Sequence, residues 1–140
     1  MIKKNQDRIF YKSEGDKYFK RNGPRINKSI FKAVKFLQPN PNSNVFEIGC
    51  GCGSTLKKIE NKFKTNVYGL DASKKAIDYA INKNNLKNMY HDTFISFKTN
   101  KKFDVIITGG FLYVTPDNLL KSTIKKLFNL MKKNSYLIIW

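Results

Sequence analysis

The sequence predicts an α/β fold, a three-layer, doubly wound domain built on a mainly parallel sheet. Short runs rich in Val, Ile, Leu and Phe alternate with longer runs whose apolar residues recur every three or four positions. The first pattern is typical of buried strands and the second of amphipathic helices. Because such alternation makes crossover connections, we expect parallel strands in the order 3-2-1-4-5, with a ligand crevice between strands one and four.

Five strands are expected, each a short apolar run, at residues 44–48, 67–70, 88–94, 103–108 and 136–140. Helices are expected around them, at 26–37, from Ser54 or Thr55 to 63, from the Ser73 cap to about 84, and from Pro116 through Met131. The segment 95–102 is too short for a full helix.

Length and composition indicate one domain. The chain has 140 residues, of which 41% are hydrophobic, enough to bury a core but short for a complete α/β enzyme. No run approaches the ~18 apolar residues of a membrane span, and no apolar run follows the charged N-terminus as a signal peptide would require. We expect a cytoplasmic protein with a polar N-terminal arm at 1–22 and the α/β domain at 23–140.

The net charge of +17 has two interpretations. The positive residues are nearly all scattered lysines, and Arg, which makes bidentate contacts with phosphates and guanine edges, occurs only as Arg8, Arg21 and Arg25. A solvated basic surface is therefore favoured, and a nucleic-acid footprint stays open.

The strongest motif is VFEIGCGCGSTL at 45–56. A buried strand leads into three glycines, which lack the Cβ that would obstruct a sharp turn and the close approach of a ligand. The spacing is not the dinucleotide-binding G-x-G-x-x-G, because Gly53 falls one position early, and a Walker A Gly-Lys-Ser/Thr is absent. Cys50 and Cys52 are too close for an unstrained disulfide and lack partners for a zinc site, so we expect no metal.

Carboxylates precede and follow this turn. Glu47, two residues before Gly49, would repel a diphosphate but attract the amino group of a methionine moiety. Asp71 ends the second predicted strand, where a carboxylate can accept both ribose hydroxyls of an adenosyl group. This acid-x-G-x-G-x-G pattern resembles motif I of the class I S-adenosylmethionine (SAM)-dependent methyltransferases, and the resemblance covers nearly the whole chain.

The resemblance implies SAM as cofactor. In this family an acid after the third strand commonly takes the adenine amino group, and the loop after the fourth strand lines the methyl-transfer site. The cofactor-binding residues so implied are Glu47, Gly49, Cys50, Gly51, Gly53, Asp71, Ala72, Asp92, Thr93, Phe94, Thr108 and Gly109. His91 is expected to be a strand-end residue without a catalytic role.

The predicted methyl acceptor is a small molecule. The sequence TGGF at 108–111 differs from the acid- or Asn-Pro-Pro-aromatic sequence of aminomethylating DNA enzymes. The stretch SEGDKYFKRN at 13–22 is similar to the arm of methyltransferases associated with pseudaminic-acid and related sugar biosynthesis, which implies a sugar or nucleotide-sugar acceptor. No catalytic base is assigned, and acceptor contacts are expected from Tyr11, Tyr18, Arg21, Phe111 and Tyr113.

The family normally continues past strand five with a helix and antiparallel strands six and seven. Here the sequence stops at Trp140, which leaves an apolar edge at 136–140. We expect a C-terminal truncation, or else a partner chain on the edge of strand five. Two functions stay open beside small-molecule methylation: an RNA-directed methyltransferase that uses the basic surface, and an inactive SAM-binding fragment or subunit.

Overall fold

The structure, a computed structural model, describes residues 6–140. It contains a five-stranded sheet in the order β3-β2-β1-β4-β5, and each neighbouring pair of strands is parallel. The predicted fold class and strand order are confirmed. The strands are β1 (Asn44–Ile48), β2 (Asn66–Asp71), β3 (Asn88–His91), β4 (Phe103–Thr108) and β5 (Met131–Ile139).

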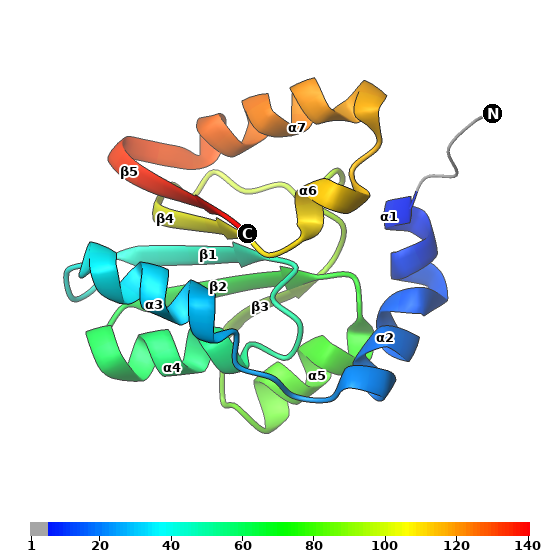
Figure 1. The fold of residues 1–140 in the computed structure, drawn as a ribbon, viewed down its shortest axis with the longest axis horizontal. Helices are drawn as coiled ribbons and strands as arrows, with labels where there is room; N and C mark the ends of the chain where they lie inside the picture. The colour runs from blue at the N-terminus through cyan, green and yellow to red at the C-terminus, as the bar shows by residue number, and fades with distance from the viewer. Residues whose placement is uncertain (1–5) are drawn as a thin grey trace.

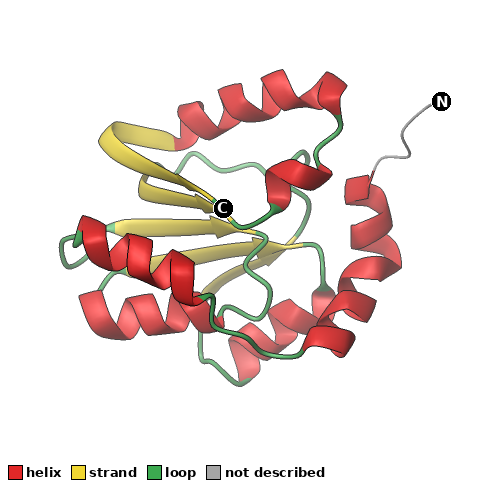
Figure 2. Ribbon diagram, viewed as in Figure 1, coloured by secondary structure: helices red, strands yellow, loops and turns green. Residues whose placement is uncertain are grey.

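Helices cover both faces of the sheet, which gives the three layers (Figures 1 and 2). One face carries α3 (Lys28–Leu37), α4 (Ser54–Phe63) and α5 (Lys74–Asn82), and the other carries α6 (Phe111–Val114) and α7 (Asp117–Leu130). None of the helices in the described part of the chain is long and apolar enough to cross a membrane.

Side-chain alternation along the strands divides the core into two clusters. On β1, Val45 faces α3 and α4 and belongs to an aliphatic cluster, whereas Phe46 and Ile48 face the opposite way into a cluster rich in phenylalanine. Phe46 stacks on Phe103 with ring centroids 4.6 Å apart. Both faces of β1 are therefore buried, as expected for a central parallel strand.

β3 and α7 are among the elements that end earlier than the sequence predicts. β3 stops at His91 rather than at Phe94, because the Asp92 carboxylate accepts hydrogen bonds from Thr93 N and Ser96 Oγ and closes a turn. The helix α7 stops at Leu130, so the predicted helical position of Met131 is wrong.

The start of β5 is irregular. Phe103 on β4 is opposite Met131, and Val105 is opposite Tyr136, so two steps along β4 match five along β5. Within this excursion Asn134 adopts a φ of 60°, which agrees with the turn predicted at 134–135. The regular part of β5 begins at Tyr136, where the sequence places the strand. On this edge strand Tyr136 and Ile139 are exposed.

The described part of the N-terminal arm, residues 6–22, is helical throughout. It consists of α1 (Gln6–Ile9), a π-helical turn η1 (Phe10–Glu14) and α2 (Gly15–Asn22). Of the described arm side chains and glycines only Gly15 is buried, so the arm is not a core element. In Figure 1 it lies beyond the carboxyl ends of β1 and β2, near the beginning of α5. The first five residues of the predicted arm lie outside the described residues.

Candidate functional site

A cavity of about 610 Å³ lies at the carboxyl ends of the strands, between β1 and β4, where the winding of the sheet reverses. Its walls come from the turn after β1, the loops after β2, β3 and β4, the arm, and the loop that joins α2 to α3. Ligands of doubly wound proteins bind at this topological position. The cavity is the place at which to look for each predicted site residue.

The glycine turn after β1 forms one wall. Gly49, Gly51 and Gly53 all have positive φ, at 76°, 54° and 68°, which is the region that glycine enters without a steric penalty. A Cβ on Gly51 would meet nothing within 4 Å, so this position is open to the cavity that it lines. A Cβ on Gly53 would lie 2.5 Å from Leu86 Cδ1, so here glycine is needed for packing.

Both cysteines of this turn are free and buried. Burial raises the pKa of the Cys50 thiol well above its ordinary value, and the nearby Asp71 and Glu47 raise it further. Cys50 is therefore a protonated thiol rather than a nucleophilic thiolate. Cys50 and Cys52 line the cavity as small apolar side chains.

Glu47 lies at the end of β1 and also lines the cavity. Only 4% of the residue is exposed, and among the described residues its Oε2 has no hydrogen-bond partner. Burial, and next the charge of Asp71, raises the pKa of the Glu47 carboxyl to about 8. An unpartnered buried carboxyl group beside a cavity is costly, and a cationic ligand group would relieve that cost.

Asp71 ends β2 and reaches the same cavity. Its Oδ2 accepts a hydrogen bond of 2.7 Å from Gly51 N, and its Oδ1 accepts one of 2.8 Å from Ser73 N. Burial raises the pKa of Asp71, while these two hydrogen bonds act in the opposite direction. The bonds join the end of β2 to the glycine turn, and Ser73 caps α5 as predicted.

The loop after β3 forms the next wall. Asp92, Thr93 and Phe94 all line the cavity. Phe94 is buried, its ring packs edge to face against Phe111 at 5.4 Å, and the Lys126 ammonium lies 4.7 Å from its centroid. His91 lies just outside the lining residues, stacked against Tyr11.

The structure places most of the predicted cofactor residues on this cavity. The set that lines it is Glu47, Gly49, Cys50, Gly51, Asp71, Ala72, Asp92, Thr93, Phe94 and Gly109. Gly53 and Thr108 do not line it: Gly53 faces Leu86 beneath the turn, and Thr108 is fully buried in β4, where its hydroxyl is directed to Ile138 O.

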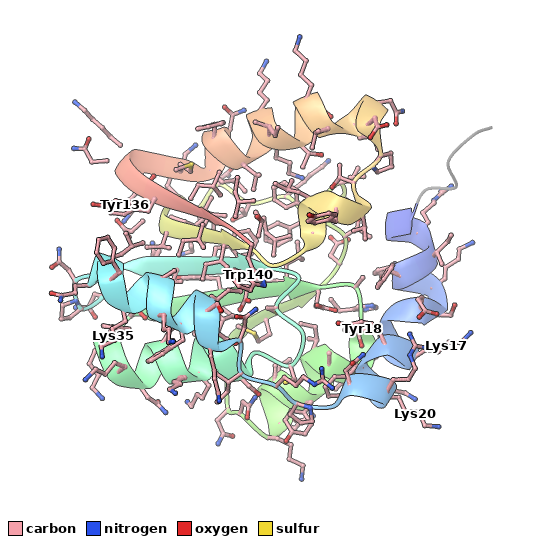
Figure 3. All side chains as sticks on the ribbon, in the orientation of Figure 1. Lys17, Tyr18, Lys20, Lys35, Tyr136 and Trp140 are labelled. Atoms are coloured by element: carbon pink, nitrogen blue, oxygen red, sulfur yellow. The ribbon has the colours of Figure 1, made fainter. Side chains whose placement is uncertain are left out.

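The predicted acceptor residues separate into two groups. Tyr18 and Phe111 line the cavity, and Figure 3 shows Tyr18 on the sheet side of α2 whereas Lys17 and Lys20 point outward. The other three do not line it. Tyr11 stacks on His91, Arg21 pairs with Glu14 on the surface, and Tyr113 is 92% exposed.

Arg25 is a cavity residue that the sequence reasoning missed. It is the only Lys or Arg among the described lining residues, which otherwise carry three carboxylates, Glu47, Asp71 and Asp92. Its Nε donates to Asn22 O, and the bond from Asn27 N to Thr55 Oγ1, 2.9 Å long, holds this loop against the start of α4. The scarcity of arginine in a lysine-rich chain was the available signal.

The loop after β4 and the end of β5 complete the enclosure. Phe111 and Val114 of α6 line the cavity together with Trp140, another residue that the sequence reasoning did not assign. Trp140 is held by backbone hydrogen bonds, since its N–H donates to Thr108 O and its carbonyl accepts from Gly110 N. This end of the cavity is mainly apolar.

The switch-point cavity, the glycine turn and the carboxylates at the ends of β1 and β2 define a Rossmann-like domain for a nucleoside-containing ligand. A family profile described as "Methyltransferase domain" matches residues 19–139. The chain therefore belongs to this family of methyltransferase domains, and the predicted family is confirmed. No curated protein matches the chain in sequence at a significant level.

Solved structures with similar folds support the same architecture. A SAM-dependent methyltransferase from Geobacter sulfurreducens in complex with S-adenosylhomocysteine (SAH) is 16% identical, with a TM-score of 0.66 over 81% of this chain and 48% of its own. A TehB-like SAM-dependent methyltransferase from Corynebacterium glutamicum is 14% identical, with a TM-score of 0.72 over 96% and 71%.

Magnesium protoporphyrin IX methyltransferase from Synechocystis, with bound SAM, is 18% identical, with a TM-score of 0.69 over 91% of this chain and 70% of its own. At these identities the likeness concerns the fold. The chain spans 48% of the length of the Geobacter structure, and 71% and 70% of the other two.

Proposed function

We propose that this chain is a SAM-dependent methyltransferase domain that binds the cofactor in the cavity between β1 and β4. The observation that carries the proposal is the buried carboxyl group of Glu47, whose Oε2 has no hydrogen-bond partner among the described residues, in the same cavity as Asp71 and the open face of Gly51. A cationic amino group beside Glu47 would offset the cost of its burial, whereas a diphosphate would increase that cost.

Each carboxyl and guanidinium group of the cavity then has a role. Glu47 holds the amino group of the methionine moiety, and Asp71, already fixed by Gly51 N and Ser73 N, accepts the ribose hydroxyls. Asp92 accepts from the adenine amino group beside Phe94. Arg25, as the single cation on the described walls, pairs with the methionine carboxylate.

When bound, SAM supplies a methyl group already activated by its sulfonium. The chain therefore has to align an acceptor with that methyl group and keep water away. Phe111, Val114 and Trp140 provide an apolar wall for this purpose next to Gly109. None of the described residues needs to act as a nucleophile, and the acceptor proton leaves to solvent or to a base on the acceptor side.

The acceptor that we propose is a small molecule, and the resemblance of the arm favours a sugar or nucleotide sugar. The cavity supports a small acceptor because its described walls hold one cation although the chain carries 27 Lys and Arg residues. An RNA acceptor is the alternative that the basic surface leaves open. This alternative predicts an RNA-binding constant whose logarithm falls steeply as the logarithm of the salt concentration rises.

A second proposal is that this chain binds SAM without turning it over alone. It is favoured by the open edge of β5, where Tyr136 and Ile139 are 53% and 63% exposed. A partner chain on that edge would then be needed for turnover. Saturable SAH binding without methyl transfer to any acceptor, together with a complex in native mass spectrometry, is its expected result.

Isothermal calorimetry with SAH tests the cofactor assignment. We expect Glu47→Ala, Asp71→Ala and Arg25→Gln each to weaken SAH binding by about tenfold or more, since each removes a charged hydrogen-bonding partner. Two matched controls lie outside the cavity in surface ion pairs: Glu60→Ala, beside Lys57, and Arg21→Gln, beside Glu14. Unchanged affinity in the three cavity variants would refute the assignment.

A further inference from the structure

The beginning of α2 is fitted closely against the turn that follows β2. Gly15 is buried there, and a Cβ on it would lie 2.8 Å from Phe10 O and 3.1 Å from both Cα and N of Ser73. These neighbours are backbone atoms, which cannot move aside as a flexible side chain can. The arm therefore touches the body of the domain at a place where only glycine leaves enough room.

The next residue, Asp16, joins the arm to α5. A single carboxylate oxygen, Oδ1, accepts a hydrogen bond of 2.8 Å from Ser73 Oγ and another of 3.0 Å from Lys75 N. The second bond satisfies one of the free backbone N–H groups in the first turn of α5, where a negative charge is also favourable. Asp16 thus acts as a capping group supplied from a distant part of the chain.

Ser73 connects this contact with the proposed ribose-binding residue. Its backbone N–H donates to Asp71 Oδ1, and the other oxygen of Asp71 accepts from Gly51 N. A continuous chain of hydrogen bonds runs from Asp16 through Ser73 and Asp71 to the glycine turn. Any displacement of Asp16 therefore removes one support of the turn that carries Asp71.

Two aromatic contacts flank this connection. Tyr11 stacks on His91, with ring centroids 4.5 Å apart and planes 6° apart, and a His91 ring nitrogen is 3.1 Å from Ala72 O. On the other side Phe19 meets Tyr79 of α5 edge to face at 5.8 Å. The arm is thus docked at three points around the residues 71–73.

We propose that the arm is a wall of the cofactor site whose docking is coupled to cofactor binding, with Asp16 as the positioning residue of that coupling. The inference rests on the proposed function, because the ligand in question is SAM or its product SAH. The docked arm places Phe10, Tyr18 and Phe19 on the cavity. By thermodynamic reciprocity, an arm that strengthens ligand binding is itself held more firmly when the ligand is bound.

The test compares Asp16→Ala with Asp16→Asn in the full chain. Because both hydrogen bonds end on Oδ1, the amide oxygen of Asn can accept them and Ala cannot. We expect Asp16→Ala to weaken SAH binding by about tenfold in calorimetry, within the usual range of coupling between sites. Asp16→Asn should keep most of the affinity. Lys17→Ala, on the outward side of α2 (Figure 3), is the control and should bind as the unchanged protein does.

Limited trypsin digestion provides a readout that a purely structural role would not move. The exposed Lys17 and Lys20 of α2 are cleavable once the arm opens. Saturating SAH should slow cleavage at these sites in the unchanged chain and in Asp16→Asn, and should not slow it in Asp16→Ala. Gly15→Ala displaces the same contact by its Cβ and should behave as Asp16→Ala does. It replaces Asp16→Ala in the test if Asp16→Ala fails to fold.

The outcomes separate this inference from the function on which it rests. If the unchanged chain binds SAH and Asp16→Ala and Gly15→Ala bind it equally well, the coupling is refuted and the proposed function stands. Equal cleavage of the arm with and without SAH in the unchanged chain also refutes it. If the unchanged chain does not bind SAH, both proposals fail together.

Discussion

Glu47 combines burial with a carboxyl group that has no partner at Oε2 among the described residues. Burial, followed by the charge of Asp71, raises its pKa from 4.5 to about 8. The folded state therefore binds one proton more than the unfolded state between these two values. The free energy of unfolding that depends on Glu47 is therefore fully present below pH 4.5. It falls as the pH rises from 4.5 and is lost once the pH has passed about 8.

The corresponding prediction concerns the ligand-free protein. Glu47→Gln should remove this loss, which amounts to about 1.4 kcal/mol of unfolding free energy per pH unit within the window. The variant should then be more stable than the unchanged chain at about pH 8. At about pH 5 the two free energies of unfolding should be closer together. Urea unfolding at the two pH values measures the difference, and parallel pH profiles for the two proteins would contradict the assignment.

Sequence reasoning identified the acids of the site better than its cation. Glu47 and Asp71 stand at strand ends in a recognisable motif, so their placement on a common cavity follows from the sheet topology. Arg25 lies in a loop whose sequence has no hydrophobic periodicity. It reaches the cavity because Asn27 N donates a hydrogen bond to Thr55 Oγ1. Such a contact between segments distant in sequence leaves no pattern that periodicity or spacing could reveal.

At the scale of elements, the glycine turn and the arm show two different uses of glycine. Gly53 is required because Leu86 fills the space where a Cβ would stand, and Gly15 because the backbone atoms of Phe10 and Ser73 do. Gly51 has free space on that side and lines the cavity. Only the last of these positions leaves room for a ligand.

Two substitutions in the turn should therefore have opposite main effects. Gly53→Ala should cost about 1–3 kcal/mol of stability through overpacking against Leu86, with the strain of its positive φ in addition. Gly51→Ala should cost about 1–2 kcal/mol for its positive φ alone and should chiefly weaken SAH binding, since its methyl group enters the cavity. Thermal unfolding and SAH calorimetry on both variants check this, and a larger binding loss in Gly53→Ala would contradict it.

The ends of the elements were predicted less well than their order. Alternating strand and helix patterns specify the sheet order, because right-handed crossovers leave few arrangements of five parallel strands. The early end of β3 depends on the bonds that Asp92 makes to Thr93 and Ser96. The early end of α7 depends on Met131 pairing with Phe103 across the sheet. The Asp92 contacts are local and of the kind that Asp makes in turns, so the strand pattern was extended too far there. The Met131–Phe103 pairing joins segments distant in sequence, and local propensity does not contain it.

At the scale of the whole molecule, the positive charge of the chain is not reflected in the lining of the cavity. The chain carries a net charge of +17, yet the described lining of the cavity has three carboxylates and one arginine. A site of this composition attracts a ligand that bears cationic groups at one end, as SAM does, and none of the lysines in the described part of the chain lines this cavity. The composition thus predicted the basic surface of the protein, and the glycine motif predicted the acidic residues of the cavity.

The dependence of SAH affinity on pH tests the central claim, that the buried carboxyl of Glu47 receives the amino group of the cofactor. In the empty site this carboxyl is protonated below about pH 8, so binding of an ammonium group must expel a proton. We predict that SAH affinity measured by calorimetry rises by up to about tenfold per unit from about pH 5.5 to about pH 7.5. In Glu47→Gln the affinity should be weak and independent of pH. A flat profile in the unchanged chain, or equal affinities in the two proteins, would contradict the account.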